Sequence, residues 1–305
     1  MPKKVDDMNI ITHKDLKVNT IKRIFDISDS IASGKIRRLK NDPTIALFFA
    51  EASTRTRVSF EVAATKLGCK SIYIDAHTSQ ASRGEELADT AKILSLYCDY
   101  IAVRINEHDK LEAMANAASI PVINALTHLE HPTQALADCY TIKTIKKGIK
   151  GLKISLIGDT AQNTFNSLMV TAAKLGADIS LVGPKSIQPN SIYVNEAKKY
   201  SNVYINSDIK KGIENSDIIY TDTFVSMGDE KEAKKRRALF APYQLNSNVL
   251  SYAKKSCNVM HPLPAHRGEE VTAEVIDGDK SVIWQQAKNK QIIEMAIMDY
   301  LSQSK

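Results

Sequence analysis

Short apolar runs alternate with helix-like stretches along most of this 305-residue chain, and this alternation constrains the fold more than any other feature. An order of strand, helix, strand, helix is typical of parallel sheets whose faces are covered by helices. We therefore expect an α/β fold made of two doubly wound domains with parallel sheets, joined by bridging helices. The expected strands are residues 44–50, 71–75, 100–104, 121–125, 153–159, 178–184, 202–207, 216–222, 258–264 and 281–284.

The length indicates two domains, because 305 residues are too many for one ordinary core and fit two domains of about 150 residues each. We place the first domain at 1–148 and the second at 149–284. A helix over 133–149 is expected to cross between them and to end in the lysine-rich turn at Gly148. The pattern of residues 285–305 predicts an amphipathic closing helix. This helix could pack on either domain, and we expect it on the first.

Composition narrows the class of protein. With 43% hydrophobic and 25% charged residues, the chain resembles soluble globular proteins. We find neither a signal peptide nor an apolar stretch long enough to span a bilayer, so we expect a cytoplasmic protein. The cysteines (Cys69, Cys98, Cys139 and Cys257) are too scattered for a metal site or a disulfide framework, so buried, reduced thiols are expected.

A formal charge of +6 suits a small anionic ligand as well as it suits nucleic acid. Two basic runs, 143–150 and 231–237, are more typical of solvated helix faces. Aromatic residues make up only 6% of the chain, and no nucleic-acid motif accompanies these runs. We therefore expect neither nucleic acid nor a membrane as a partner.

The sequence SerThrArgThrArg, residues 53–57, follows the apolar run 44–50 and begins a helix-like stretch. Ser53 is a favourable helix N-cap, and Gly68 is a natural stop. The free N–H groups and the dipole of a helix start attract anions. Hydroxyls from Ser53, Thr54 and Thr56 add donors, and Arg55 can bind a phosphate through two parallel hydrogen bonds. The residues predict a phosphate site; a capped surface helix with solvated arginines is the alternative.

Other predicted strands end in polar groups suited to the same ligand. Arg104 closes the run 100–104, and His131, Thr133 and Gln134 follow the run 121–125. In open α/β sheets, ligands bind at the carboxyl ends of the strands. A third segment, HPLP at 261–264, contains two prolines that favour an extended loop with accessible carbonyls. Each histidine taken singly is more often structural than catalytic, but their shared location favours a site.

Together these motifs resemble the carbamoyltransferases that use carbamoyl phosphate, and the ornithine enzymes among them more than the aspartate enzymes. The similarity covers about residues 44–300. It is carried by STRTR (53–57), SRGE (82–85), HPTQALAD (131–138), VSMGDE (225–230) and HPLPAHRGEEVTAEVIDG (261–278).

The resemblance implies roles for individual residues. Ser53, Thr54, Arg55 and Thr56 should hold the phosphate of carbamoyl phosphate, and Arg104, His131 and Gln134 should hold its carbamoyl end. Gln80 matches the residue that such enzymes lend to the site of a neighbouring subunit, which implies a homotrimer or a multiple of one. Asn163, Asp222, Ser226 and Met227 match the positions that bind the amino-acid end of ornithine.

The implied reaction is direct attack of a deprotonated amine on the carbamoyl carbon, with phosphate as the leaving group. Thr56, Arg104 and His131 should stabilise the charge that develops on the carbamoyl oxygen. The departing phosphate can accept the proton of the amine. The products from ornithine are citrulline and phosphate, and neither a metal nor an organic cofactor is implied.

Two positions depart from the ornithine pattern. Pro262 stands where the ornithine enzymes usually have cysteine and is the choice of the aspartate enzymes, so the carbonyls of Pro262 and Leu263 could receive the carbamoyl NH₂ group. Lys290 stands where ornithine enzymes have an arginine, which keeps the charge but loses the planar fork. Another acceptor (a shorter diamino acid, putrescine or aspartate) and a non-catalytic homologue that binds carbamoyl phosphate stay open as alternatives. A dehydrogenase is disfavoured, because LIGDTAQN (156–163) lacks the glycine-rich fingerprint.

Overall fold

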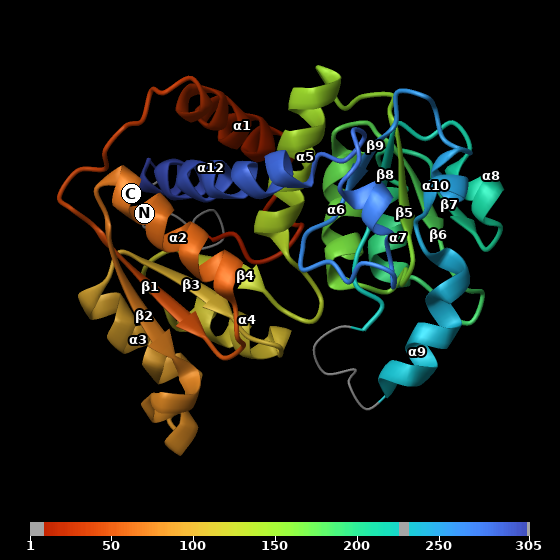
Figure 1. The fold of residues 1–305 in the computed structure, drawn as a ribbon. Coiled ribbons are helices and arrows are strands. Elements are labelled where there is room, and N and C mark those ends of the chain that lie inside the picture. Colours follow the sequence, from red (N-terminus) through yellow and green to blue (C-terminus); the bar gives the residue numbers. More distant parts are fainter. Residues whose placement is uncertain (1–8, 226–231, 304–305) are drawn as a thin grey trace. The chain divides into compact units, whose positions relative to one another are not determined.

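The computed structural model describes residues 9–225 and 232–303, which divide into two compact units (Figure 1). The first unit consists of Met1–Tyr140 with Asn289–Lys305, and the second of Thr141–Lys288. The chain passes between the units within α5 (Pro132–Lys146) and within α12 (Ile283–Ser302). The sequence placed these divisions after residues 148 and 284 instead, because residue patterns mark the ends of helices and the observed divisions lie inside them.

The first unit contains a four-stranded parallel sheet. Its strands are β1 (Thr44–Phe49), β2 (Lys70–Asp75), β3 (Tyr100–Arg104) and β4 (Val122–Leu126). Their order across the sheet is β2-β1-β3-β4. The chain moves from β1 outward to β2, then returns to the other side of β1 for β3 and β4. The strand order therefore reverses between β1 and β3, and a crevice at such a switch point is the usual ligand site of this architecture.

Helices cover this sheet on both faces (Figure 1). They are α1 (Val18–Ala32), α2 (Thr54–Leu67), α3 (Leu87–Tyr97) and α4 (His108–Ala117), with short turns η2 (Ala76–Thr78) and η3 (Gln80–Arg83). One core joins alternate residues of β1 and β3 to α3 and α4, including Phe48, Val103, Leu94 and Leu111. This alternation follows from the two-residue period of a strand, which sends successive side chains to opposite faces.

The second unit contains a five-stranded parallel sheet of order β7-β6-β5-β8-β9. Its strands are β5 (Lys153–Ile157), β6 (Asp178–Val182), β7 (Val203–Asn206), β8 (Ile218–Thr221) and β9 (Asn258–Met260). Its further helices are α6 (Asn163–Lys174), α7 (Ser191–Ala197), α8 (Ile209–Ile213), α9 (Ala233–Phe240), η5 (Ala241–Tyr243), α10 (Ser247–Leu250) and α11 (Ala273–Ile276). Here the strand order reverses between β5 and β8.

The predicted fold class is confirmed, since both units are α/β with parallel sheets. The strand expected at 281–284 is wrong: Ser281 makes one isolated bridge to Val259, and α12 begins at Ile283. A short apolar run can begin a helix as readily as it forms a strand. The closing helix is also less one-sided than its pattern indicated, because the polar residues Glu294 and Asp299 are buried along with the apolar ones.

All four cysteines lie in the described part of the chain, where they are buried and form no disulfide, as the sequence predicted. Among the helices that the structure describes, none combines the length and the apolar character that a membrane span requires.

Candidate functional site

The first turn of α2 presents polar groups immediately after β1. Ser53 has the extended backbone of an N-cap, and its Oγ accepts a hydrogen bond from the Thr56 N–H at 3.3 Å. Gly68 ends the helix in the left-handed conformation, with φ of 78°. Both local predictions for this segment are therefore confirmed. The side chains of Thr54 and Arg55 are exposed on this turn, whereas Thr56 is buried.

Arg104 lies at the carboxyl end of β3, on the other side of the switch point from this turn. In the sheet register it pairs with Phe49, the last residue of β1, and its carbonyl accepts from the Ala50 N–H at 2.8 Å. Its side chain is buried, and burial lowers the pKa of the guanidinium to about 10; Glu51 favours the charged form and Arg55 opposes it. A buried cation beside another cation is a favourable setting for an anionic ligand.

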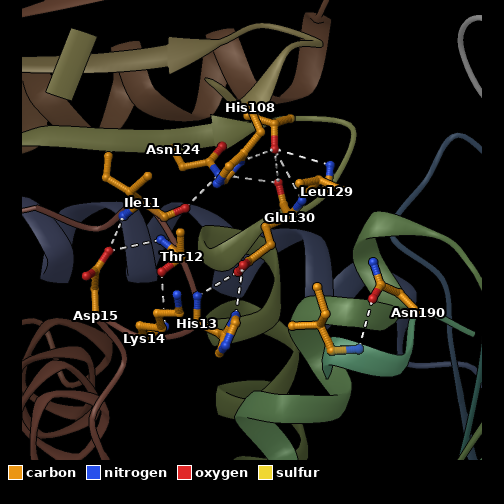
Figure 2. Close-up of polar contacts among 12 residues, drawn as sticks. Ile11, Thr12, His13, Lys14, Asp15, His108, Asn124, Leu129, Glu130 and Asn190 are labelled. Atoms are coloured by element: carbon orange, nitrogen blue, oxygen red, sulfur yellow. Dashed lines mark hydrogen bonds and ion pairs between the residues drawn. The ribbon is translucent and has the colours of Figure 1, made fainter. Parts of the chain in front are cut away.

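The loop between β4 and α5 ends at His131, and Gln134 lies in the first turn of α5, so both follow β4 at the same sheet edge. This loop is fixed by its own hydrogen bonds (Figure 2). The Thr127 N–H donates to the Glu130 carbonyl at 2.9 Å, and the Glu130 N–H donates to Thr127 Oγ1 at 3.2 Å. Asn124 Nδ2 donates to the Ile11 carbonyl at 2.8 Å, which attaches the N-terminal segment. The backbone before His131 is therefore held from both sides.

Lys290, on α12, connects the elements of this edge. Its Nζ donates to Thr56 Oγ1 at 3.0 Å and to Gln134 Oε1 at 3.1 Å. Gln134 in turn donates from Nε2 to Asp138 Oδ1 at 2.8 Å. All four side chains are buried. This cluster, which we call the lysine network (Thr56, Gln134, Asp138 and Lys290), joins the first turn of α2 to the start of α5 within the first unit.

The electrostatics of this edge favour a negative ligand and a neutral histidine. Burial lowers the pKa of His131 well below its ordinary value, and the nearby charges of Lys290 and Arg104 lower it further. Its imidazole is therefore uncharged in the neutral pH range. Thr133 Oγ1 lies 3.3 Å from His131 Nδ1. A neutral imidazole can donate a hydrogen bond to a carbonyl oxygen without adding another cation.

The second unit presents polar groups at its own switch point. Asp222 follows β8, and Asn163 and Thr164 begin α6 after β5. The Asp222 carboxylate accepts from Thr164 Oγ1 at 2.7 Å and from the Thr223 N–H at 2.7 Å. Burial raises the pKa of Asp222, and His261 acts in the opposite direction. Two hydrogen bonds, from Thr164 and Thr223, therefore hold the Asp222 carboxylate at the sheet edge, where it could bind an ammonium group.

Pro262 and Leu263 belong to a loop that His261 and Glu270 organise. The Leu263 N–H donates to His261 Nδ1 at 2.9 Å, which leaves Nε2 to donate to Glu270 Oε1 at 3.1 Å. Glu270 Oε1 also accepts from the His266 N–H at 2.6 Å. Leu263 has a positive φ of 60°, a conformation that a branched side chain adopts only when its surroundings hold it there.

The structure places the predicted residues in two groups. The first unit contains Ser53, Thr54, Arg55, Thr56, Arg104, His131, Gln134 and Lys290. The second unit contains Asn163, Asp222, Pro262 and Leu263. Gln80 is exposed at the start of η3, after edge strand β2. Ser226 and Met227 lie outside the described residues.

Several residues in these clusters were missed by the sequence reasoning. They are Asp138, Thr164 and Glu270. Asp138 lies one helical turn after Gln134, so helical spacing could have indicated it. Thr164 directly follows the predicted residue Asn163. Glu270 contacts His261 across a loop whose path no periodicity predicts.

Comparisons with known proteins cover both units. The description "Aspartate/ornithine carbamoyltransferase, carbamoyl-P binding domain" matches residues 8–144, and "Aspartate/ornithine carbamoyltransferase, Asp/Orn binding domain" matches residues 150–301. The ornithine carbamoyltransferase of Bacillus subtilis is 43% identical over 295 residues, which make up 95% of this chain and 92% of the relative. The solved ornithine carbamoyltransferase from Pyrococcus furiosus superposes with a TM-score of 0.90 at 40% identity, over 96% of both chains. The anabolic ornithine carbamoyltransferase from Campylobacter jejuni gives a TM-score of 0.92 at 33% identity, over 97% of this chain and 99% of that chain.

Proposed function

The chain belongs to the aspartate/ornithine carbamoyltransferase family, and on this premise we propose that it transfers the carbamoyl group of carbamoyl phosphate to the side-chain amine of L-ornithine, giving L-citrulline and phosphate. The observation that carries the proposal is that each unit has its polar cluster at the point where its strand order reverses. One cluster is cationic and suits a phosphate, and the other contains a carboxylate and suits an ammonium group.

In this proposal carbamoyl phosphate binds to the first unit. Ser53, Thr54 and Arg55 receive the phosphate together with the first N–H groups of α2. Arg104, His131 and Gln134 hold the carbamoyl end. Lys290 supplies a further cation beside Thr56, and it stays attached to that hydroxyl through its 3.0 Å hydrogen bond.

The second unit binds the acceptor. Asp222 receives its α-ammonium group, and Asn163, Ser226 and Met227 complete the amino-acid site. The aspartate enzymes need arginines for two carboxylates, whereas the buried Asp222 would repel such a substrate. This difference supports ornithine over aspartate as the acceptor.

The chemistry requires only positioning and charge stabilisation. The neutral side-chain amine attacks the carbamoyl carbon, the C–O bond to phosphate breaks, and phosphate leaves with its electron pair and accepts a proton from the amine. Thr56, Arg104 and His131 stabilise the oxygen on which charge develops, and one such donor typically contributes about 3 kcal/mol. The carbonyls of Pro262 and Leu263 accept hydrogen bonds from the carbamoyl NH₂.

We also propose a homotrimer, or a multiple of one, in which Gln80 contributes to the site of a neighbouring subunit. Large apolar side chains are exposed on α2, β2 and α3 of the first unit: Val58, Val62, Ile72, Ile93, Leu96 and Tyr97. Apolar surface of this kind is typical of subunit interfaces. A mixture of Gln80→Ala and Arg55→Ala subunits, each impaired alone at low carbamoyl phosphate, should regain part of the activity if the sites are shared, and none if each subunit is self-sufficient.

The proposed setting is arginine metabolism in the cytoplasm. The buried, reduced state of all four cysteines is in keeping with a reducing compartment.

The test is product identification by mass from carbamoyl phosphate with ornithine, aspartate, putrescine, lysine or 2,4-diaminobutyrate. We expect ornithine to exceed every other acceptor in kcat/KM by at least about 100-fold, which is about 2.7 kcal/mol. A preference for another amine would leave a carbamoyltransferase but refute ornithine, with Pro262 and Lys290 as the positions to exchange first. Absence of any carbamoylated product would favour a non-catalytic binding protein.

A further inference from the structure

Glu294 is a buried carboxyl group close to the lysine network. It lies on α12 one helical turn beyond Lys290, so the two side chains share a face of the helix. Glu294 is fully buried, and its carboxylate oxygens accept no hydrogen bond within 3.5 Å, since the nearby Ser59 hydroxyl donates to the Thr56 carbonyl. A buried carboxylate without partners is costly unless a nearby charge compensates it or a proton neutralises it. Its presence therefore calls for a specific electrostatic partner.

That partner is Lys290. Burial raises the pKa of Glu294, while first the Lys290 ammonium and then the nearby Ser59 hydroxyl on α2 lower it. Burial likewise lowers the pKa of Lys290, and Glu294 is the largest influence that raises it. These opposite shifts bring the pKa values of Glu294 and Lys290 close together, so the charge of each group depends on the charge of the other.

Lys290 needs such support because its surroundings are mostly cationic. Arg55 on α2 and Arg104 on β3 both oppose its charge, and His131 is held neutral beside it. Asp138 on α5 favours the ammonium form, but its Oδ1 already accepts from Gln134. Without another negative group nearby, Lys290 would lose its proton as the pH rises whenever no anion is bound beside it.

We propose that Glu294 is a positioning residue that loses its proton in place of Lys290, so that the lysine remains an ammonium group, bonded to Thr56 and Gln134, in the alkaline range. At lower pH the pair is a neutral carboxyl with an ammonium. As the pH rises, the carboxyl proton passes to solvent, and the resulting carboxylate holds the proton on Lys290. This inference rests on the proposed binding of carbamoyl phosphate beside Lys290.

The first measurement is the titration of Lys290 itself, without any ligand. In protein labelled with ¹³C at the lysine ε-carbons, the Lys290 signal is identified by its loss in Lys290→Arg. We expect the midpoint of Lys290 to be lower by about 1 pH unit or more in Glu294→Gln than in the parent protein. Glu294→Leu should give the same shift and serves if the glutamine variant folds poorly. Equal midpoints in the parent and both variants would overturn the proposal, whatever the enzyme's activity.

The second measurement is calorimetric binding of carbamoyl phosphate from pH 6.5 to 9. The dissociation constants of the parent protein and Glu294→Gln should agree at pH 6.5, where both have a charged lysine and a neutral group at 294. At pH 9 the variant should bind about tenfold more weakly, in line with a shift of one unit. In a Lys290→Arg background the same substitution should cause no alkaline loss, because arginine does not titrate in this range.

These outcomes separate the two proposals. A shifted Lys290 midpoint with no binding of carbamoyl phosphate by the parent protein would refute the proposed function and leave the proton assignment intact. An alkaline loss that persists in the Lys290→Arg background would refute the action of Glu294 through Lys290.

Discussion

The backbone N–H of His13 donates to Glu130 Oε2 at 2.6 Å, and His13 Nδ1 lies 2.8 Å from Oε1 of the same carboxylate (Figure 2). Both residues are buried and are 117 positions apart in the sequence. Because Glu130 directly precedes His131, the N-terminal segment fixes the backbone that delivers this histidine to the sheet edge. The pair therefore links the stability of the first unit to the geometry of the proposed site.

We expect Glu130→Ala to lower the free energy of unfolding by about 3 kcal/mol, because it removes the acceptor of two buried hydrogen bonds. Urea denaturation measures this change. Glu112→Ala is the matched control, since Glu112 is exposed and lies 3.7 Å from His108 Nε2, and exposed pairs contribute about 0–1 kcal/mol. Equal losses in the two variants would show that the His13–Glu130 contact has no special weight.

The parts of the site that the sequence predicted are those governed by local chemistry. Ser53 and Gly68 could be assigned as the ends of α2 because a cap and a left-handed stop depend on neighbouring residues only. The position of Arg104 at a carboxyl end followed from the length of its apolar run. The lysine network could not be derived in this way, because Lys290 and Thr56 are 234 residues apart and meet only when α12 packs.

The remaining errors have physical causes. The pattern of α12 indicated one apolar face, yet Glu294 is buried, because a charged residue can be buried when another charge compensates it and no hydrophobicity pattern reports that pairing. The apparent strand at 281–284 is the entry into α12, where an apolar run begins a helix. Both errors concern a segment whose structure is decided by tertiary packing.

Arg55→Ala should raise the KM for carbamoyl phosphate about 100-fold, since charged hydrogen bonds to a phosphate contribute about 1.5–3 kcal/mol. Arg57→Ala is the matched control two residues away. Its Nε donates to Glu61 at 2.9 Å, and its guanidinium lies 3.6 Å from the centre of the Tyr73 ring, so it is committed elsewhere. Steady-state kinetics should show less than about a threefold change for this control. Similar effects of both substitutions would place the phosphate elsewhere.

Asp222→Asn should raise the KM for the acceptor about 50-fold and leave that for carbamoyl phosphate within about threefold, because the amide cannot pair with an ammonium group. Asparagine keeps an oxygen for the Thr223 N–H, so the turn after β8 is preserved. The separate KM values distinguish a binding role from simple capping of this turn. If both KM values stayed at the parent level, Asp222 would be a structural residue.

The depressed pKa of His131 also predicts how stability depends on pH. Burial, followed by Lys290 and Arg104, lowers this pKa in the folded protein below the value of about 6.5 found in unfolded chains. The unfolded state therefore binds one more proton in the range between the two values. The stabilisation is fully present above pH 6.5 and is lost as the pH falls below it, by about 1.4 kcal/mol per pH unit for each such proton. His108, whose pKa burial also lowers, adds to the same loss.

His131→Gln should remove one of these protons without introducing a charge. Between pH 6.5 and 5, the free energy of unfolding of this variant should fall less steeply than that of the parent protein, by about 1.4 kcal/mol per pH unit. Carboxyl groups that titrate in the same range are common to both proteins and cancel in the difference. Urea denaturation at half-unit intervals, referenced to pH 8, measures both slopes. Parallel slopes would mean that His131 accepts a proton in the folded protein, and a charged imidazole would then have to be included among the groups that bind the carbamoyl oxygen.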